Sequence, residues 1–430
     1  MRAPDVHLNL NVRGMGASAT VAINERCDAL RAAGRRVFKL GLGQSPFPVP
    51  PRVVQALRDH AHQKDYLPVR GLPALRQAVA AYHERRDGVA RGAEDVLVGP
   101  GSKELMFLLQ LVYYGDLVIP TPAWVSYAPQ ARVIGRQVRL IDTQPEQAWR
   151  LTAGRLEQLC QEDPARPRIV ILNTPDNPTG GSYSRHELRA LAEVSQRYRV
   201  VLLSDEIYGE LHHGGDHFSI ASLYPEGTII SSGLSKWCGA GGWRLGTFLF
   251  PPGMRWLLDA MAAIASETFT STCAPVQYAA VAAFQEDPET ESYLRSSRRI
   301  LGALGGWVHG RLVAAGLECA RPQGGFYLFP DFSPAIGNLG AVGIADSLSL
   351  CERLLEDTGV AILPGAVFGR PPTELTARLA YVDFDGEAAL EAAAGQDGAL
   401  DEAFLRRHCG AVVEATERVV GWLEGLRRAA

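Results

Sequence analysis

Short apolar runs alternate with longer amphipathic stretches between about residues 96 and 250. These runs are three or four residues long and contain β-branched side chains; they cover residues 96–98, 117–119, 169–172, 200–203 and 228–230. Continuous apolar runs of this length are typical of strands that are buried on both faces. A stretch with the spacing of an amphipathic helix covers residues 185–197. The pattern predicts an α/β fold with a mostly parallel sheet and helical crossovers.

The chain changes character after about residue 290. An arginine-rich helical stretch begins there, a Gly-Gly-Phe-Tyr segment follows at residues 324–327, and the pattern predicts one helix from Glu402 to the C-terminus. A length of 430 residues also favours more than one domain. We therefore expect a large domain at residues 51–305 and a smaller α+β domain at residues 306–430, to which residues 1–50 contribute.

Composition and charge exclude several classes of function. The chain is 47% hydrophobic and 21% charged, which is ordinary for a globular protein, and its formal net charge of −4 gives no basic surface for nucleic acid. The N-terminus lacks the apolar stretch of a signal peptide, and no uncharged run approaches the ~18 residues of a membrane span. The seven cysteines include no Cys-x-x-Cys pair. We expect a cytoplasmic protein with reduced thiols and no membrane partner.

Polar and aromatic residues follow each of the predicted strands. In a parallel sheet, ligands bind beyond the carboxyl ends of the strands, so these exits are where chemistry is expected. The exits cover residues 99–103, 121–124, 173–180, 204–208 and 231–237.

The last of these exits carries Lys236, and Arg244 follows eight residues later. A lysine amine at a strand end could bond an aldehyde, while a nearby hydroxyl and the guanidinium hold an attached phosphate. Ser102 opens a helix after a strand, so free backbone N–H groups there face a bound anion. The alternatives are solvated loop residues and a simple N-cap by Ser102.

Three other exits could complete a site for a planar, charged ring. Asp205 ends a buried apolar run, where a carboxylate is costly unless it has a cationic partner such as a pyridinium nitrogen. Asn177 and Tyr208 could bond a ring oxygen, and Trp124 could stack on the ring face. The alternatives are a turn at Asn177 and packed aromatic side chains at the other two positions.

Together these motifs resemble the class I/II aminotransferases of pyridoxal-phosphate fold type I. The resemblance runs from about residue 18 to 380; it includes Tyr66 within residues 65–76, the Asn-Pro-Thr-Gly string at 177–180, the spacing of Asp205 and Tyr208, and Lys236 with Arg244. It implies a large domain with helices on both faces of the sheet and pyridoxal 5'-phosphate as cofactor. It also implies ping-pong transfer of an amino group from an amino acid to a 2-oxo acid, in a homodimer with active sites at the subunit interface.

The resemblance also implies a role for each matched residue. Lys236 would form the aldimine with the cofactor and then shuttle the substrate proton. Asp205 would keep the ring nitrogen protonated, Asn177 and Tyr208 would bond the ring oxygen, and Trp124 would stack on the ring. The phosphate would be bound by Ser102 and Lys103 through their backbone amides, with Gly101, Arg244 and either Ser232 or Ser235, joined by Tyr66 from the neighbouring subunit.

Arg378 matches the arginine that clamps the substrate α-carboxylate, assisted by Asn177 and the Gly43 amide. Such a clamp fixes which Cα bond reacts. Burial beside Arg244 and a cationic ring is expected to lower the pKa of Lys236.

Two departures from the family pattern bear on binding. Gly233 stands where many relatives carry a Ser or Thr for the phosphate. No arginine occurs between Arg255 and Arg295, the region where dicarboxylate-specific relatives of one subgroup carry one. This absence favours a substrate with a neutral, aromatic or unusual side chain.

Three alternative functions stay open at this point. An elimination, replacement or ring-closing enzyme, such as an aminocyclopropane-carboxylate synthase, would need the same lysine, aspartate and arginine, since fold does not decide function. An aminotransferase-like sensor of a transcription regulator would need a DNA-binding domain, and only about 20 residues precede the matching region. The histidines at 212, 213 and 217 raise a metal site, although an exposed turn explains them more simply and we predict no metal.

Overall fold

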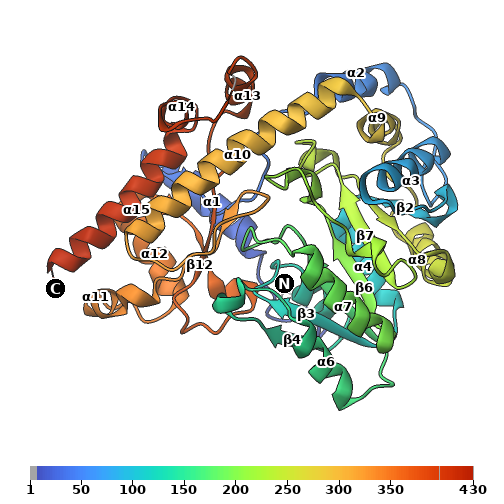
Figure 1. Cartoon of the computed structure of the whole chain (residues 1–430), viewed down its shortest axis with the longest axis horizontal. Coiled ribbons are helices and arrows are strands. Elements are labelled where there is room, and N and C mark those ends of the chain that lie inside the picture. Colours follow the sequence, from blue (N-terminus) through green and yellow to red (C-terminus); the bar gives the residue numbers. More distant parts are fainter. Residues whose placement is uncertain (1–6, 397, 430) are drawn as a thin grey trace, which may run out of the picture.

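The computed structural model describes residues 7–396 and 398–429. Its largest sheet has seven strands in the order β2-β8-β7-β6-β5-β3-β4, and only β8 runs antiparallel to its neighbours (Figure 1). The predicted α/β fold with a mostly parallel sheet is therefore confirmed. The strands are β2 (Val96–Gly99), β3 (Asp116–Thr121), β4 (Val138–Asp142), β5 (Arg168–Asn173), β6 (Val201–Asp205), β7 (Thr228–Gly233) and β8 (Gly246–Leu249).

The central strands bury side chains on both faces of the sheet. On β5, Ile169 and Ile171 belong to the core shared with α4 (Ser102–Val112) and α8 (Arg255–Glu267). Val170 and Leu172 belong to the core shared with α6 (Ala153–Glu162) and α7 (Arg185–Arg197). Because successive side chains point to opposite faces, only an uninterrupted apolar run can fill both cores, at roughly 2 kcal/mol per fully buried side chain.

Local signals set the ends of the helices. Ser184 and Glu187 form a capping box that starts α7 at the residue the sequence predicts. Asp287 caps α10 (Pro288–Ala314), which begins with proline, crosses the molecule diagonally in Figure 1 and contains the expected domain boundary at residue 305. The predicted C-terminal helix is two helices that meet at Cys409, before Gly410.

Two small sheets join distant parts of the chain. β1 (Phe38–Lys39) pairs in parallel with β10 (Val360–Ala361). β12 (Ala377–Ala380) lies between β11 (Leu363–Pro364) and β9 (Tyr327–Leu328), antiparallel to both. The first pairing supports a contribution of residues 1–50 to a smaller domain, and the division into domains remains a proposal.

The other helices pack around these sheets (Figure 1). They are α1 (Ala19–Ala32), α2 (Pro51–His60), α3 (Pro73–Asp87), α5 (Tyr127–Val133), α9 (Ala274–Phe284), α11 (Ile336–Ala341), α12 (Ser347–Thr358), α13 (Gly386–Ala394), α14 (Glu402–His408) and α15 (Gly410–Ala429). None of the helices in the described ranges combines the length and apolar character that a membrane span requires. All seven cysteines are unpaired, and burial raises the pKa of the Cys238 thiol near the lysine.

Candidate active site

A cavity of about 470 Å³ lies beyond the carboxyl ends of β5, β6 and β7. Most of the predicted site residues line it, from parts of the chain that are more than 300 positions apart. They are Gly43, Ser102, Lys103, Trp124, Asn177, Asp205, Tyr208, Ser235, Lys236, Arg244 and Arg378.

Three predicted residues lie outside the lining of this cavity. Gly101 is the residue before α4, next to Arg244. Ser232 lines a separate cavity, so Ser235 is the better placed of the two serines. Tyr66 is 89% exposed, as a residue that reaches a neighbouring subunit should be, and that role stays a prediction.

Lys236 follows β7 and has no carboxylate partner among the described residues. Its Nζ donates a hydrogen bond to the Gly43 carbonyl oxygen at 2.7 Å. Desolvation lowers the pKa of Lys236 to about 8, and the positive charge of Arg378 adds more to this shift than that of Arg244, which the sequence had suggested. An amine with this pKa can take up and release a proton near neutral pH.

Asp205 ends β6 and is buried without an ion pair among the described residues. Tyr127 donates to its Oδ2 at 2.6 Å, and Ser231 donates to its Oδ1 at 3.3 Å. Desolvation raises the pKa of Asp205 to about 6 despite these hydrogen bonds. A buried carboxylate in this position is stabilised by a cation, and the protonated ring nitrogen of pyridoxal phosphate fits that need.

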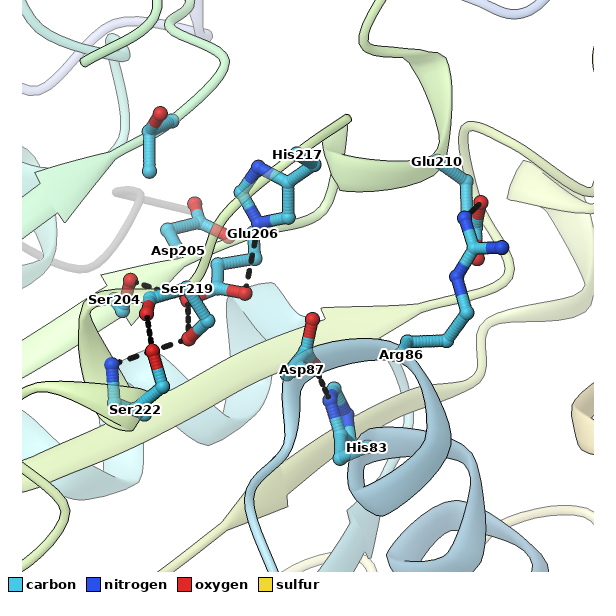
Figure 2. A network of polar contacts seen from close by, with 12 residues as sticks. His83, Arg86, Asp87, Ser204, Asp205, Glu206, Glu210, His217, Ser219 and Ser222 are labelled. Atoms are coloured by element: carbon cyan, nitrogen blue, oxygen red, sulfur yellow. Dashed lines mark hydrogen bonds and ion pairs between the residues drawn. The ribbon is translucent and has the colours of Figure 1, made fainter. Parts of the chain in front are cut away.

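Glu206 directs its side chain away from the cavity, into the network that Figure 2 shows. It accepts hydrogen bonds from Ser204 at 2.7 Å, Ser219 at 2.6 Å and His217 Nε2 at 2.9 Å. Although burial acts to raise it, the bond from His217 holds the pKa of Glu206 below its ordinary value. This network anchors the strand exit that carries Asp205.

The histidine segment is exposed only at residues 214–216, so the prediction of an exposed turn is wrong for all three histidines. One possible metal-ligand atom from each of His217, Glu206 and Asp87 lies within 4.8 Å of the other two. Each already has a partner within the chain, since His83 pairs with Asp87 at 2.6 Å and His217 with Glu206. The hydrogen bonds thus join these side chains in two separate pairs, and the buried Nδ1 of His217 has no partner among the described residues.

Arg378, on β12, is a buried cation without a carboxylate partner among the described residues. Its Nη1 donates to Asn177 Oδ1 at 3.0 Å and its Nη2 to the Gly41 carbonyl oxygen at 2.5 Å, while its buried Nε has no partner. The guanidinium lies 4.7 Å from the centre of the Tyr327 ring. An uncompensated buried guanidinium of this kind suits a substrate carboxylate.

The N-terminus of α4 and Arg244 form the anion-binding end of the cavity. Within the described part of the chain, Arg244 donates only to backbone carbonyls, of Gly241 at 3.0 Å and Pro100 at 3.4 Å, and no carboxylate there neutralises its charge. A Cβ at Gly101, where φ is +93°, would lie 2.2 Å from Arg244 Nη2. Unpaired N–H groups at a helix start, beside an unpaired guanidinium, fit a phosphate.

Six further residues line the cavity that were not among the predicted site residues: the apolar Leu42 and Ile207, and the polar Thr20, Tyr127, Asn173 and Tyr327. Tyr127 lies in the first turn of α5, three residues after Trp124, and Asn173 is the last residue of β5 and donates to the Asp205 carbonyl oxygen at 2.7 Å. Asn173 lies within a predicted strand exit and Tyr127 lies three residues after another, and these positions were the available signal. Tyr327 comes from the three-stranded sheet, whose position relative to the large sheet the sequence does not reveal.

Comparisons with known proteins agree with this geometry. The sequence model of the family described as aminotransferase class I and II matches residues 35–383. The aspartate aminotransferase of Geobacillus stearothermophilus is 35% identical over 86% of this chain and 93% of its own length. The asparagine–oxo-acid transaminase of Streptococcus mutans is 32% identical over 87% and 94%. The structure of aspartate aminotransferase from Thermus thermophilus with maleate superposes with a TM-score of 0.81 at 31% identity, covering 91% of this chain and 98% of that one.

Proposed function

The chain belongs to the class I and II aminotransferases, pyridoxal-phosphate enzymes that move an amino group from an amino acid to a 2-oxo acid, and we propose that aspartate is its amino donor. The observation that carries the choice of donor is the charge of the cavity. Four cationic side chains line it against one carboxylate: Lys103, Lys236, Arg244 and Arg378 against Asp205.

The family roles give Lys103 a phosphate contact through its backbone amide and leave its side-chain ammonium without a ligand. Arg244 suits the phosphate, Arg378 the α-carboxylate and Lys236 the cofactor aldehyde. The Lys103 Nζ lies 5.1 Å from the centre of the Trp124 ring. Desolvation lowers the pKa of Lys103, and the positive charge of Arg244 lowers it further. An ammonium beside the ring-stacking tryptophan supplies a partner for a second carboxylate. In this proposal, the Lys103 ammonium takes the place of the arginine that dicarboxylate-specific relatives carry and that is absent between Arg255 and Arg295. The absence of that arginine had favoured a neutral or aromatic substrate.

The protein's own groups supply binding and proton transfer. When bound, pyridoxal phosphate supplies an aldehyde that takes up the amino group and a ring that withdraws electrons from the substrate Cα. We assign Lys236 Nζ to the attachment of the cofactor and to movement of the Cα proton. Arg378 orients the α-carboxylate, and Asp205 holds a proton at the ring nitrogen.

We assign the remaining contacts to residues at the strand exits. Asn177 and Tyr208 bind the ring oxygen and Trp124 covers the ring face. The phosphate is assigned to the start of α4, with Ser235 and Arg244. We also infer a homodimer that brings Tyr66 of one subunit to the phosphate of the other; the exposed Tyr66 and the exposed apolar Leu8 and Leu10 support it. A cytoplasmic location stays a prediction from the sequence.

An amino-donor panel tests the choice of substrate. Wild-type enzyme should use aspartate in preference to alanine and phenylalanine. Lys103→Met, which keeps the side-chain stem, should lower kcat/KM for aspartate roughly 30-fold, because one charge-assisted hydrogen bond is lost. The same variant should change kcat/KM for alanine less than about threefold, since alanine has no second carboxylate.

Cofactor titration of Lys103→Met serves as the control, because weakened phosphate binding would lower the rates with every donor alike. An equal loss for aspartate and alanine, or a wild type that prefers phenylalanine, would contradict the assignment. Release of ammonia in the absence of a 2-oxo acid acceptor would indicate the elimination reaction instead.

A further inference from the structure

Tyr327 lies between two side chains with assigned roles. It is 1% exposed and lies on β9, next to the strand that carries Arg378. Its hydroxyl oxygen is 2.8 Å from that of Tyr208, and the Arg378 guanidinium lies 4.7 Å from the centre of its ring. We propose that Tyr327 is a positioning residue, which directs the Tyr208 hydroxyl toward the cofactor oxygen and supports Arg378 with its ring. The proposal rests on the cofactor placement given above, and it is independent of the amino donor.

The direction of the hydrogen bond follows from counting protons. Each phenol has one hydrogen, and burial raises the pKa of both Tyr208 and Tyr327, so both stay protonated in a neutral assay. If Tyr208 gives its hydrogen to the cofactor oxygen, the 2.8 Å contact persists only with Tyr327 as donor. A hydroxyl that accepts a hydrogen bond becomes a stronger donor in its own bond.

The surroundings leave the Tyr327 hydroxyl little freedom. A Cβ on Gly43 would lie 1.9 Å from its oxygen, so the space beside Gly43 is filled by this hydroxyl. The carbonyl of the same glycine accepts the hydrogen bond from Lys236 Nζ at 2.7 Å. The hydroxyl is thus held between Tyr208 and the backbone that contacts the reactive lysine.

A pH titration of the cofactor absorbance band, without any amino donor, tests this role. Tyr327→Phe keeps the ring against Arg378 and removes only the hydroxyl. Tyr208 then becomes a weaker donor, the cofactor oxygen keeps more negative charge, and the proton at Lys236 Nζ is held more firmly. We expect the pKa of the Lys236–cofactor linkage, read from the absorbance band, to rise by roughly 0.3 unit or more.

The matched control is Tyr381→Phe, which removes a buried hydroxyl that donates a hydrogen bond to the Gly325 carbonyl oxygen at 3.4 Å, and should leave the band unchanged. In a Tyr208→Phe background, Tyr327→Phe should add no further shift. Gly43→Ala, which displaces the hydroxyl from the opposite side, should shift the band in the same direction as Tyr327→Phe.

Two results would overturn the proposal: no shift in Tyr327→Phe, or the same shift in the presence and absence of the Tyr208 hydroxyl. A wrong choice of amino donor leaves this titration unaffected. A protein that forms no cofactor band would instead contradict the placement of the cofactor, and the role of Tyr327 with it.

Discussion

Replacement of Lys236 by alanine is expected to lower turnover with every amino donor by roughly 10⁴-fold or more, because it removes both the nucleophile and the general base. Among the residues that the structure describes, Lys103 is the one other lysine in the cavity lining, which includes no histidine, and it lies beside Trp124. The lowered pKa of Lys236, about 8, is a property of this buried amine that a surface lysine does not have. Steady-state rates with saturating aspartate and 2-oxo acid measure the effect.

Lys236→Arg is the matched control, because it keeps the positive charge but cannot lose its proton at neutral pH. We expect it to be as inactive as Lys236→Ala, and both variants to retain the unfolding midpoint of the cofactor-free wild type within a few degrees. Substantial turnover by either variant would mean that another group carries the proton.

The second large effect is expected for Asp205→Asn, with turnover reduced by roughly 10³-fold through the loss of an electrostatic contact to the ring nitrogen. The amide fills the same space but carries no charge to stabilise a protonated ring. Glu206→Gln is the control, since this neighbouring carboxylate is bound to His217 and Ser219 away from the cavity (Figure 2). Glu206→Gln should lower the turnover rate less than about tenfold, because the Glu206 side chain does not face the ring.

The pH dependence of the unfolding free energy, measured without cofactor, also distinguishes Asp205→Asn from the wild type. Burial raises the pKa of Asp205 to about 6, above the ~3.9 of an unfolded aspartate. The stability that this proton contributes is complete below about pH 4 and is lost as the pH rises through about 6. Over that range the wild type should lose roughly 3 kcal/mol more than Asp205→Asn in urea unfolding. Parallel pH profiles would contradict a buried, unpaired carboxylate.

The apolar runs predicted the central strands because their residues fill two cores at once. The strands β4 and β8 escaped prediction, and β8 begins at Gly246 and runs antiparallel between two parallel strands. Its glycine cannot carry a side chain, because a Cβ there would lie 2.1 Å from the Ser102 amide nitrogen. The close approach of β8 to the start of α4 therefore depends on this glycine.

The site was predictable wherever its residues follow strands in chain order. Ser232 was predicted as a phosphate ligand but does not line the cavity. Ser231 pairs in register with Asp205 and donates a hydrogen bond to it. Because side chains alternate along a strand, Ser232 points to the opposite side of the sheet. Tyr327 escaped because it depends on how the three-stranded sheet docks beside the large one. The contact between Tyr208 and Tyr327 joins residues 119 positions apart, a separation at which local patterns carry no information.

The central claim is that Lys236 Nζ carries the cofactor while Asp205 faces its ring. Borohydride reduction of the wild-type protein loaded with pyridoxal phosphate, followed by peptide mass spectrometry, tests it most directly. We predict the mass of the reduced cofactor on the peptide that contains Lys236, and no such addition on the peptide that contains Lys103. Attachment to another lysine, or no attachment to a protein that has taken up the cofactor, would contradict the account.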